Sequence, residues 1–96
     1  MAAPVSSELF HLGDVQLSFE AMERNGQSHP SGWSASWEQC ALCGRWLNPG
    51  SVTARVLVDP ELNLLPASAA VVPPEFESQP LGESCLRKVP RNYRWS

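Results

Sequence analysis

Three cysteines constrain the fold of this chain more than any other feature of its sequence. Cys40 and Cys43 are separated by two residues and followed at once by Gly44, and Cys85 lies 42 positions after Cys43. Two intervening residues allow both sulfurs to face one ion, and a glycine after the second ligand accommodates a tight turn with positive φ. The pattern predicts a zinc knuckle over 40–44, with Cys85 as a third ligand of Zn²⁺.

The length of the chain explains why a metal would matter. Its 96 residues make one domain the expectation, and a chain of this size buries only roughly 60–65 % of the surface that its unfolded form exposes. Such small cores often depend on a metal, on disulfides or on a partner. An odd number of cysteines fits a disulfide framework poorly, so structural zinc is the preferred interpretation. Inert buried thiols and a redox-active pair remain the alternatives.

A structural zinc site normally has four ligands, and this chain has only three cysteines. We expect His29 to be the fourth ligand, because it precedes Pro30 in a polar loop and could fold back towards the knuckle. His11, Asp59, Glu83 and a water molecule remain alternatives. Taken alone, each histidine is better explained as an ordinary surface or core-edge residue.

Hydrophobic alternation predicts short strands on both sides of the knuckle. Residues 15–22 alternate with period two and predict a half-buried strand, with a helix over 19–24 as the competing interpretation. Asn25-Gly26 is typical of a hairpin turn. Residues 33–37 alternate aromatic and small side chains with serines and predict a second strand.

The second half of the chain has clearer signals. Residues 51–58 are the best predicted strand, because valines and an alanine alternate with Thr, Arg and Leu. A turn follows, and 62–65 can return as the partner strand. Residues 67–80 contain several prolines and predict a loop. Residues 82–89 suit one or two helical turns that Pro90 would end.

These elements predict a small α+β fold of the treble-clef type. Its parts are a zinc knuckle, two short antiparallel β-hairpins and one short C-terminal helix that carries Cys85. Helix N-terminal amides favour a thiolate at that place. We expect residues 1–96 to form one domain, with 1–12 and 91–96 as ends that could fray.

The residues around the cysteines also resemble a known group of proteins. The motif Cys40-x-x-Cys43-Gly44-Arg45 and the later segment Gly82-x-x-Cys85-x-Arg87-Lys88 are similar to the CxxCGR and GxxCxRK motifs of small zinc-knuckle proteins of phages and mobile elements. The resemblance covers about residues 37–90 and implies a metal-stapled module. Genes of this group often accompany anti-defence functions, including anti-CRISPR proteins, so a role as such an inhibitor is an expectation.

Charge is unevenly placed along the chain. The net charge of -3 excludes a generally basic nucleic-acid coat. Residues 1–86 hold all ten acidic side chains, whereas 87–96 hold four cations and no acid. A basic, aromatic tail could bind phosphates and stack on bases. Its candidate residues are Arg87, Lys88, Arg91, Arg94 and Trp95. The competing interpretation is that the tail docks on the acidic body through Tyr93 or Trp95.

The motifs of common enzymes are missing from the sequence. It contains no Gly-x-Ser-x-Gly elbow, no phosphate loop, no HExxH and no zinc-deaminase signature. No apolar run approaches the ~18 residues of a membrane helix, and the start of the chain lacks a secretory leader, so a cytoplasmic location is expected. If the chain is phage-encoded, that location is the host cell cytoplasm.

We therefore expect a non-enzymatic, zinc-stapled accessory protein that binds another protein. Trp33 and Phe76 are the candidate interface residues. A nucleic-acid-binding zinc module that uses the basic tail is the alternative function. The sequence does not specify the partner or the oligomeric state.

Overall fold

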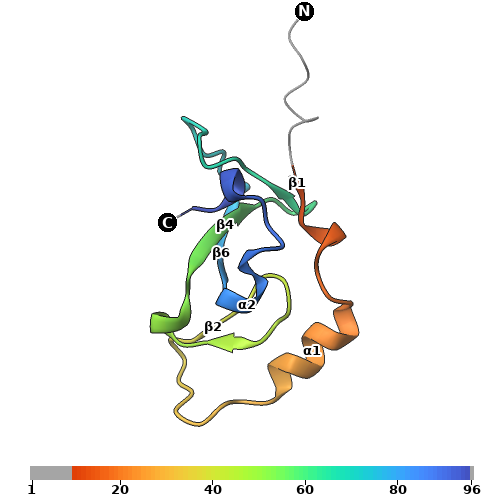
Figure 1. Cartoon of the computed structure of the whole chain (residues 1–96), viewed down its shortest axis with the longest axis vertical. Helices are drawn as coiled ribbons and strands as arrows, with labels where there is room; N and C mark the ends of the chain where they lie inside the picture. The colour runs from red at the N-terminus through yellow and green to blue at the C-terminus, as the bar shows by residue number, and fades with distance from the viewer. Residues whose placement is uncertain (1–9, 96) are drawn as a thin grey trace, which may run out of the picture.

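The computed structural model describes residues 10–95, which form a small α+β fold (Figure 1). This confirms the predicted fold class, with antiparallel hairpins around a cluster of cysteines. The strands are β1 (Phe10–His11), β2 (Glu38–Gln39), β3 (Trp46–Leu47), β4 (Ala54–Val58), β5 (Asn63–Leu64) and β6 (Glu77–Leu81). The helices are α1 (Phe19–Gln27) and α2 (Glu83–Leu86), with 3₁₀ turns at Leu12–Asp14, Pro49–Ser51 and Arg91–Tyr93.

The strands form two antiparallel sheets. The larger sheet has the order β1-β5-β4-β6, and β2 pairs with β3 in the smaller one. Strand β4 pairs with β6 over its full length, from Ala54 opposite Leu81 to Val58 opposite Glu77. The strand predicted over 51–58 is confirmed from residue 54 onward. Ser51 ends a 3₁₀ turn that Pro49 opens, and β4 begins only at Ala54.

Strand β6 was not predicted, since its residues belong to the expected loop over 67–80. The segment Glu-Ser-Gln-Pro-Leu has poor intrinsic strand propensity, and it is a strand because β4 offers it a complete partner. Pro80 is tolerated because β6 is an edge strand, where a missing N–H costs little. The carbonyl of Pro80 accepts a hydrogen bond from the backbone N–H of Ala41 at 2.9 Å, which ties β6 to the knuckle.

The prediction of a strand over 15–22 is wrong, because helix α1 occupies its second half. Ser18 Oγ accepts a hydrogen bond from the backbone N–H of Ala21 at 3.1 Å and caps the start of the helix. Asn25-Gly26, predicted as a hairpin turn, lies inside the helix. The competing interpretation of a helix over 19–24 is therefore the correct one, and the described residues contain two helices where one was expected.

Residues 33–37 form turns where a second strand was predicted. The backbone N–H of Trp33 donates to Pro30 O at 3.0 Å, and that of Trp37 donates to Ser34 O at 3.1 Å. These local hydrogen bonds close two tight turns, and β2 begins only after them, at Glu38.

The hydrophobic core is one cluster that joins the larger sheet, the knuckle and the C-terminal segment. Its buried residues are Leu12, Cys40, Ala41, Leu42, Cys43, Val56, Val58, Leu64, Leu81, Cys85, Val89 and Tyr93. All three cysteines therefore belong to the core itself. A metal held by them would be part of the packing that stabilises the fold.

Both described ends of the chain pack against the larger sheet. Strand β1 pairs with β5, and Leu12 is buried. At the other end Tyr93 is buried, and Trp95 exchanges two backbone hydrogen bonds of 2.8 Å with Arg55. Residues 10–12 and 91–95 of the two ends therefore pack against the sheet, the arrangement that the competing interpretation of a docked tail describes. Residues 1–9 and 96 of the expected tails lie outside the described residues.

Candidate metal centre

Residues 40–45 form the tight turn that the Cys-x-x-Cys-Gly pattern predicted. The backbone N–H of Cys40 donates to Arg45 O at 2.8 Å, and that of Gly44 donates to Cys40 O at 3.0 Å. Gly44 has a φ of 78°, the left-handed conformation that glycine adopts without strain. The strand pair β2–β3 emerges from the two ends of this turn. The pairing of β2 with β3 therefore fixes the backbone positions of Cys40 and Cys43.

Helix α2 brings the third cysteine to the knuckle. Strand β6 ends at Leu81, Gly82 caps α2 with an extended backbone, and Cys85 lies on the buried side of the helix. The sulfurs of Cys40, Cys43 and Cys85 all lie within 4.8 Å of one another. A tetrahedral ion with Zn–S bonds of about 2.3 Å holds its sulfurs roughly 3.8 Å apart. The three side chains are close enough together that they could hold a metal ion.

The surroundings of Cys40 and Cys85 shift the pKa values of their two thiols in opposite directions. Burial acts to raise the pKa of the Cys40 thiol, but backbone N–H groups that donate to its sulfur outweigh burial and hold the pKa below its usual value. These donors are the amides of Gly82, Leu42 and Cys43. Burial, reinforced by the negative charge of Cys40, raises the pKa of the Cys85 thiol to about 12. A cation bound here would displace the Cys85 proton, so metal uptake and proton release are linked.

The structure does not bring His29 to the sulfurs, so its prediction as fourth ligand is not met. Within residues 10–95 no histidine or carboxylate joins the three cysteines in one cluster. The His29 ring stacks on Trp33 with centroids 4.1 Å apart, and its edge meets Trp46 at 5.3 Å. Three aromatic rings therefore hold the loop in which a metal ligand was expected.

The other candidates for the fourth position are also placed elsewhere. His11 Nε2 lies 3.1 Å from Glu61 O, and Asp59 accepts hydrogen bonds from the backbone N–H groups of Glu61 and Asn63. The side chains of His11 and Asp59 thus both contact residues in or beside the turn between β4 and β5. Glu83 is exposed in the first turn of α2.

A set of hydrogen bonds that the sequence analysis missed surrounds the knuckle. The carbonyls of residues 41–44 each accept a hydrogen bond from outside the turn. Their donors are Gln16 Nε2 to Ala41 at 2.9 Å, Leu17 N to Leu42 at 2.9 Å, Asn25 Nδ2 to Cys43 at 2.7 Å and Gln39 Nε2 to Gly44 at 2.9 Å. A buried carbonyl needs such a donor. Only Gln39 lies beside the cysteines in the sequence. Gln16 and Asn25 precede Cys40 by 24 and 15 positions, so no local signal marked their contacts.

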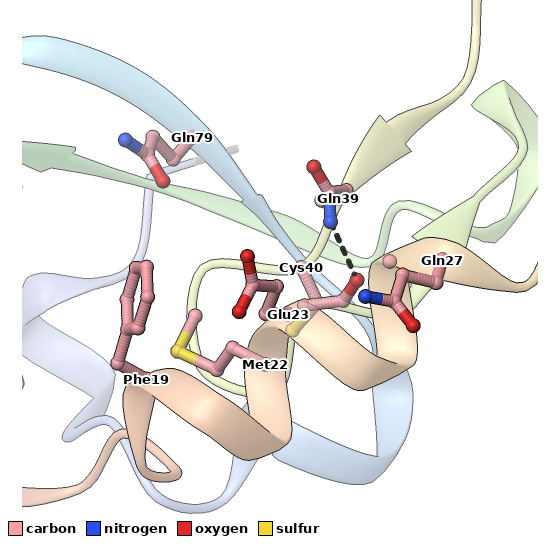
Figure 2. Close-up of a pocket in the computed structure, with 9 residues that line it drawn as sticks. Phe19, Met22, Glu23, Gln27, Gln39, Cys40 and Gln79 are labelled. Atoms are coloured by element: carbon pink, nitrogen blue, oxygen red, sulfur yellow. Dashed lines mark hydrogen bonds between the residues drawn. The ribbon is translucent and has the colours of Figure 1, made fainter.

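Helix α1 lies against the knuckle with a cavity of about 520 Å³ beside it. Figure 2 shows Phe19, Met22 and Glu23 projecting from α1 and Cys40 from the knuckle around this space. No residue of α1 is buried, and Phe19 is 78 % exposed. The helix therefore rests on the knuckle through polar contacts and leaves apolar surface open.

The predicted interface residues are not the most exposed apolar side chains. Trp33 is half-buried between His29 and Trp46, and Phe76 is half-buried before β6. The exposed large apolar side chains of the described residues are Leu17, Phe19, Val71 and Val72. Leu17 and Phe19 lie at the start of α1, so apolar surface gathers beside the knuckle.

The basic tail is partly engaged by the fold. Trp95 Nε1 donates to Leu65 O at 3.0 Å, and Arg94 Nε donates to Val89 O at 2.9 Å. The other three predicted cations, Arg87, Lys88 and Arg91, are exposed. The tryptophan proposed to stack on bases is thus held against the body of the protein.

No protein-family model, curated protein or solved structure matches this chain. Among the helices of residues 10–95, none is both long and apolar enough to cross a membrane. What the chain does must therefore be argued from its own residues.

Proposed function

We propose that this chain is a zinc-stapled, non-enzymatic accessory domain that acts by binding another protein. The observation that carries the proposal is the cluster of three buried cysteine sulfurs within 4.8 Å of one another. Thiolate sulfur is a preferred ligand of zinc, and cysteine-rich tetrahedral sites are characteristic of structural zinc. The knuckle motif points to the same ion.

The position of the sulfurs supports a structural role for the metal. The site joins the β2–β3 turn to α2, and Cys85 lies 42 positions after Cys43 in the chain. Zinc binding to such sites contributes about 10–16 kcal/mol at neutral pH, comparable with the whole stability of a typical domain. In a chain with so small a core, the metal would decide whether the fold forms.

The burial of the sulfurs supports a function without catalysis. Cys40, Cys43 and Cys85 are only 2 %, 9 % and 5 % exposed. Catalytic zinc keeps one position open to water or substrate, whereas structural zinc is enclosed. Cysteines stay reduced, and free to bind metal, most readily in a reducing compartment, which agrees with the expected cytoplasmic location.

The apolar surface beside the knuckle supports a protein partner. Phe19, the first residue of α1, is 78 % exposed, and Leu17, just before the helix, is 39 % exposed. The knuckle holds this helix in place. Exposed apolar side chains that gather at one place are typical of contact sites. A phage or mobile-element origin and an anti-defence role rest on the motif resemblance alone.

Native mass spectrometry of the purified protein tests the proposal directly. We expect one zinc ion per chain, lost together with folding when a chelator is added. Ser84→Ala, next to Cys85 but exposed, is the matched control for Cys85→Ser and should retain the ion. Protein that folds without any bound metal would refute the zinc staple. For the contact surface, Phe19→Ser should abolish capture of a partner that Val71→Ser still captures.

A further inference from the structure

Helix α1 is fixed in register against the second cysteine. Asn25 Nδ2 donates to the carbonyl of Cys43 at 2.7 Å. The Met22 backbone lies so close to Gly44 that a Cβ on that glycine would be 2.5 Å from Met22 O. These two contacts leave the helix little freedom to slide or rotate on the knuckle. Glu23 therefore has a defined position, between Met22 and Asn25 on a helix that touches the metal-binding turn.

Glu23 and Cys40 line the same cavity between α1 and the knuckle (Figure 2). Glu23 is the one carboxylate among the residues that line this cavity. The Glu23 side chain is exposed, and it forms no ion pair with another side chain of residues 10–95. A carboxylate with no such partner thus lines the same hollow as Cys40. It is not among the ligand atoms that lie within 4.8 Å of one another, so the Glu23 side chain has to rotate toward the sulfurs to bind the ion.

Of the side chains that could compete with Glu23, Glu83 lines a different hollow that none of the cysteines lines, and the other three are held by other contacts. His29 is stacked on Trp33, and Asp59 accepts backbone hydrogen bonds in the turn after β4. His11 lies in that same region, 3.1 Å from Glu61 O. Each would have to leave these partners to reach the knuckle, whereas Glu23 already lies on the helix packed against it.

We propose that Glu23 is the fourth protein ligand of the metal, an inference that rests on the proposed zinc site. A carboxylate oxygen binds zinc at about 2.0–2.2 Å and is an accepted companion of cysteine ligands. Three thiolates and one carboxylate carry the same charge as the four thiolates of a common structural site. The ligation also gives α1 a role, because the helix that braces the knuckle would complete the metal site.

Two glutamates on the same helix allow a matched test. Glu20 is exposed on α1 as Glu23 is, but it does not line the cavity. Zinc affinity is measured by chelator competition for the wild type, Glu23→Gln and Glu20→Gln. We expect Glu23→Gln to weaken zinc binding by at least tenfold, since even residues that only orient a ligand cost about 10–100-fold when lost. Glu20→Gln should bind as the wild type does.

A second experiment looks for a gain in metal absorption, so its result does not depend on a loss of zinc affinity. In the Co²⁺-loaded protein, Glu23→Cys should strengthen the sulfur-to-metal charge-transfer absorption, because a fourth sulfur then reaches the ion. Glu20→Cys should leave the absorption unchanged. Wild-type affinity in Glu23→Gln, with an unchanged spectrum in Glu23→Cys, would overturn the assignment of Glu23 and leave the three-cysteine zinc site standing. A wild-type protein that binds neither Zn²⁺ nor Co²⁺ would overturn both proposals.

Discussion

The body of the molecule and helix α1 are held in place by different kinds of contact. The body buries Val56, Leu64, Leu81 and Val89 to 0 % exposure, and the three sulfurs lie in the same cluster. Helix α1 buries none of its residues and contacts the body through hydrogen bonds to the knuckle. The body should therefore unfold as one cooperative unit, whereas α1 should open at a lower free energy.

Loss of a metal ligand should have the largest effect, because the staple lies within the core of the body. Cys85→Ser replaces a thiolate at a site that joins α2 to the knuckle. We expect loss of bound zinc and of cooperative unfolding at 25 °C, since the metal contributes about 10–16 kcal/mol. Circular dichroism during thermal unfolding, with zinc content measured in parallel, checks this. A cooperative transition in this variant at the wild-type temperature would show that apolar packing alone holds the body.

Truncation of the apolar core should come second. Leu64→Ala removes a fully buried side chain from β5, where it lies opposite both Phe10 and Val58. We expect a loss of about 2–5 kcal/mol in the free energy of unfolding, measured by denaturant titration with zinc bound. Val71→Ala, at a site that is 75 % exposed, should change it by less than about 0.5 kcal/mol. Equal effects of the two variants would contradict the core described here.

A smaller and local effect is expected where α1 meets the knuckle. Asn25→Ala leaves the carbonyl of Cys43 without its donor, which costs about 1–3 kcal/mol for a buried group. Hydrogen exchange should show faster opening of α1 amides while those of β4 keep their protection. Gln27→Ala, at an exposed position of the same helix, is the control. If β4 and α1 lose protection together, the two regions are one cooperative unit and the comparison fails.

The smallest effect concerns a surface ion pair between the two sheets. Arg55 of β4 donates to both carboxylate oxygens of Glu38 of β2, each at 2.9 Å. These hydrogen bonds hold the pKa of Glu38 below its usual value. The stabilisation is therefore present above the pKa of the unfolded carboxyl, and it is lost as the pH falls through the lower folded pKa. We expect Glu38→Gln to cost about 0–1 kcal/mol near pH 7 at low salt. The difference from the wild type should vanish in acid, and a difference that persists there would contradict the ion pair.

The parts of the fold that the sequence predicted are those with strong local signals. Alternating valines marked β4, and the Cys-x-x-Cys-Gly spacing marked the turn at Gly44. Strand β6 was missed because its propensity is poor and its partner residues lie 19 to 27 positions away in the chain. Helix α1 was misassigned because the apolar alternation from Val15 continues by chance into residues that Ser18 caps as a helix.

The candidate site could be predicted only as far as its cysteines. Their spacing and the glycines beside them are local features, and the structure brings the three sulfurs together. His29 was preferred as a ligand for its position before Pro30, but ring stacking on Trp33 holds it elsewhere. The approach of α1 to the knuckle depends on tertiary contacts of Gln16 and Asn25 that no local pattern encodes.

Thermal unfolding before and after zinc chelation tests the central claim most directly. The claim is that the metal and the apolar core form one unit, since all three cysteines belong to the buried cluster. We predict one cooperative transition with one zinc ion per chain, and loss of that transition when the ion is removed. A transition that stays at the same temperature after complete removal of the metal would contradict the account.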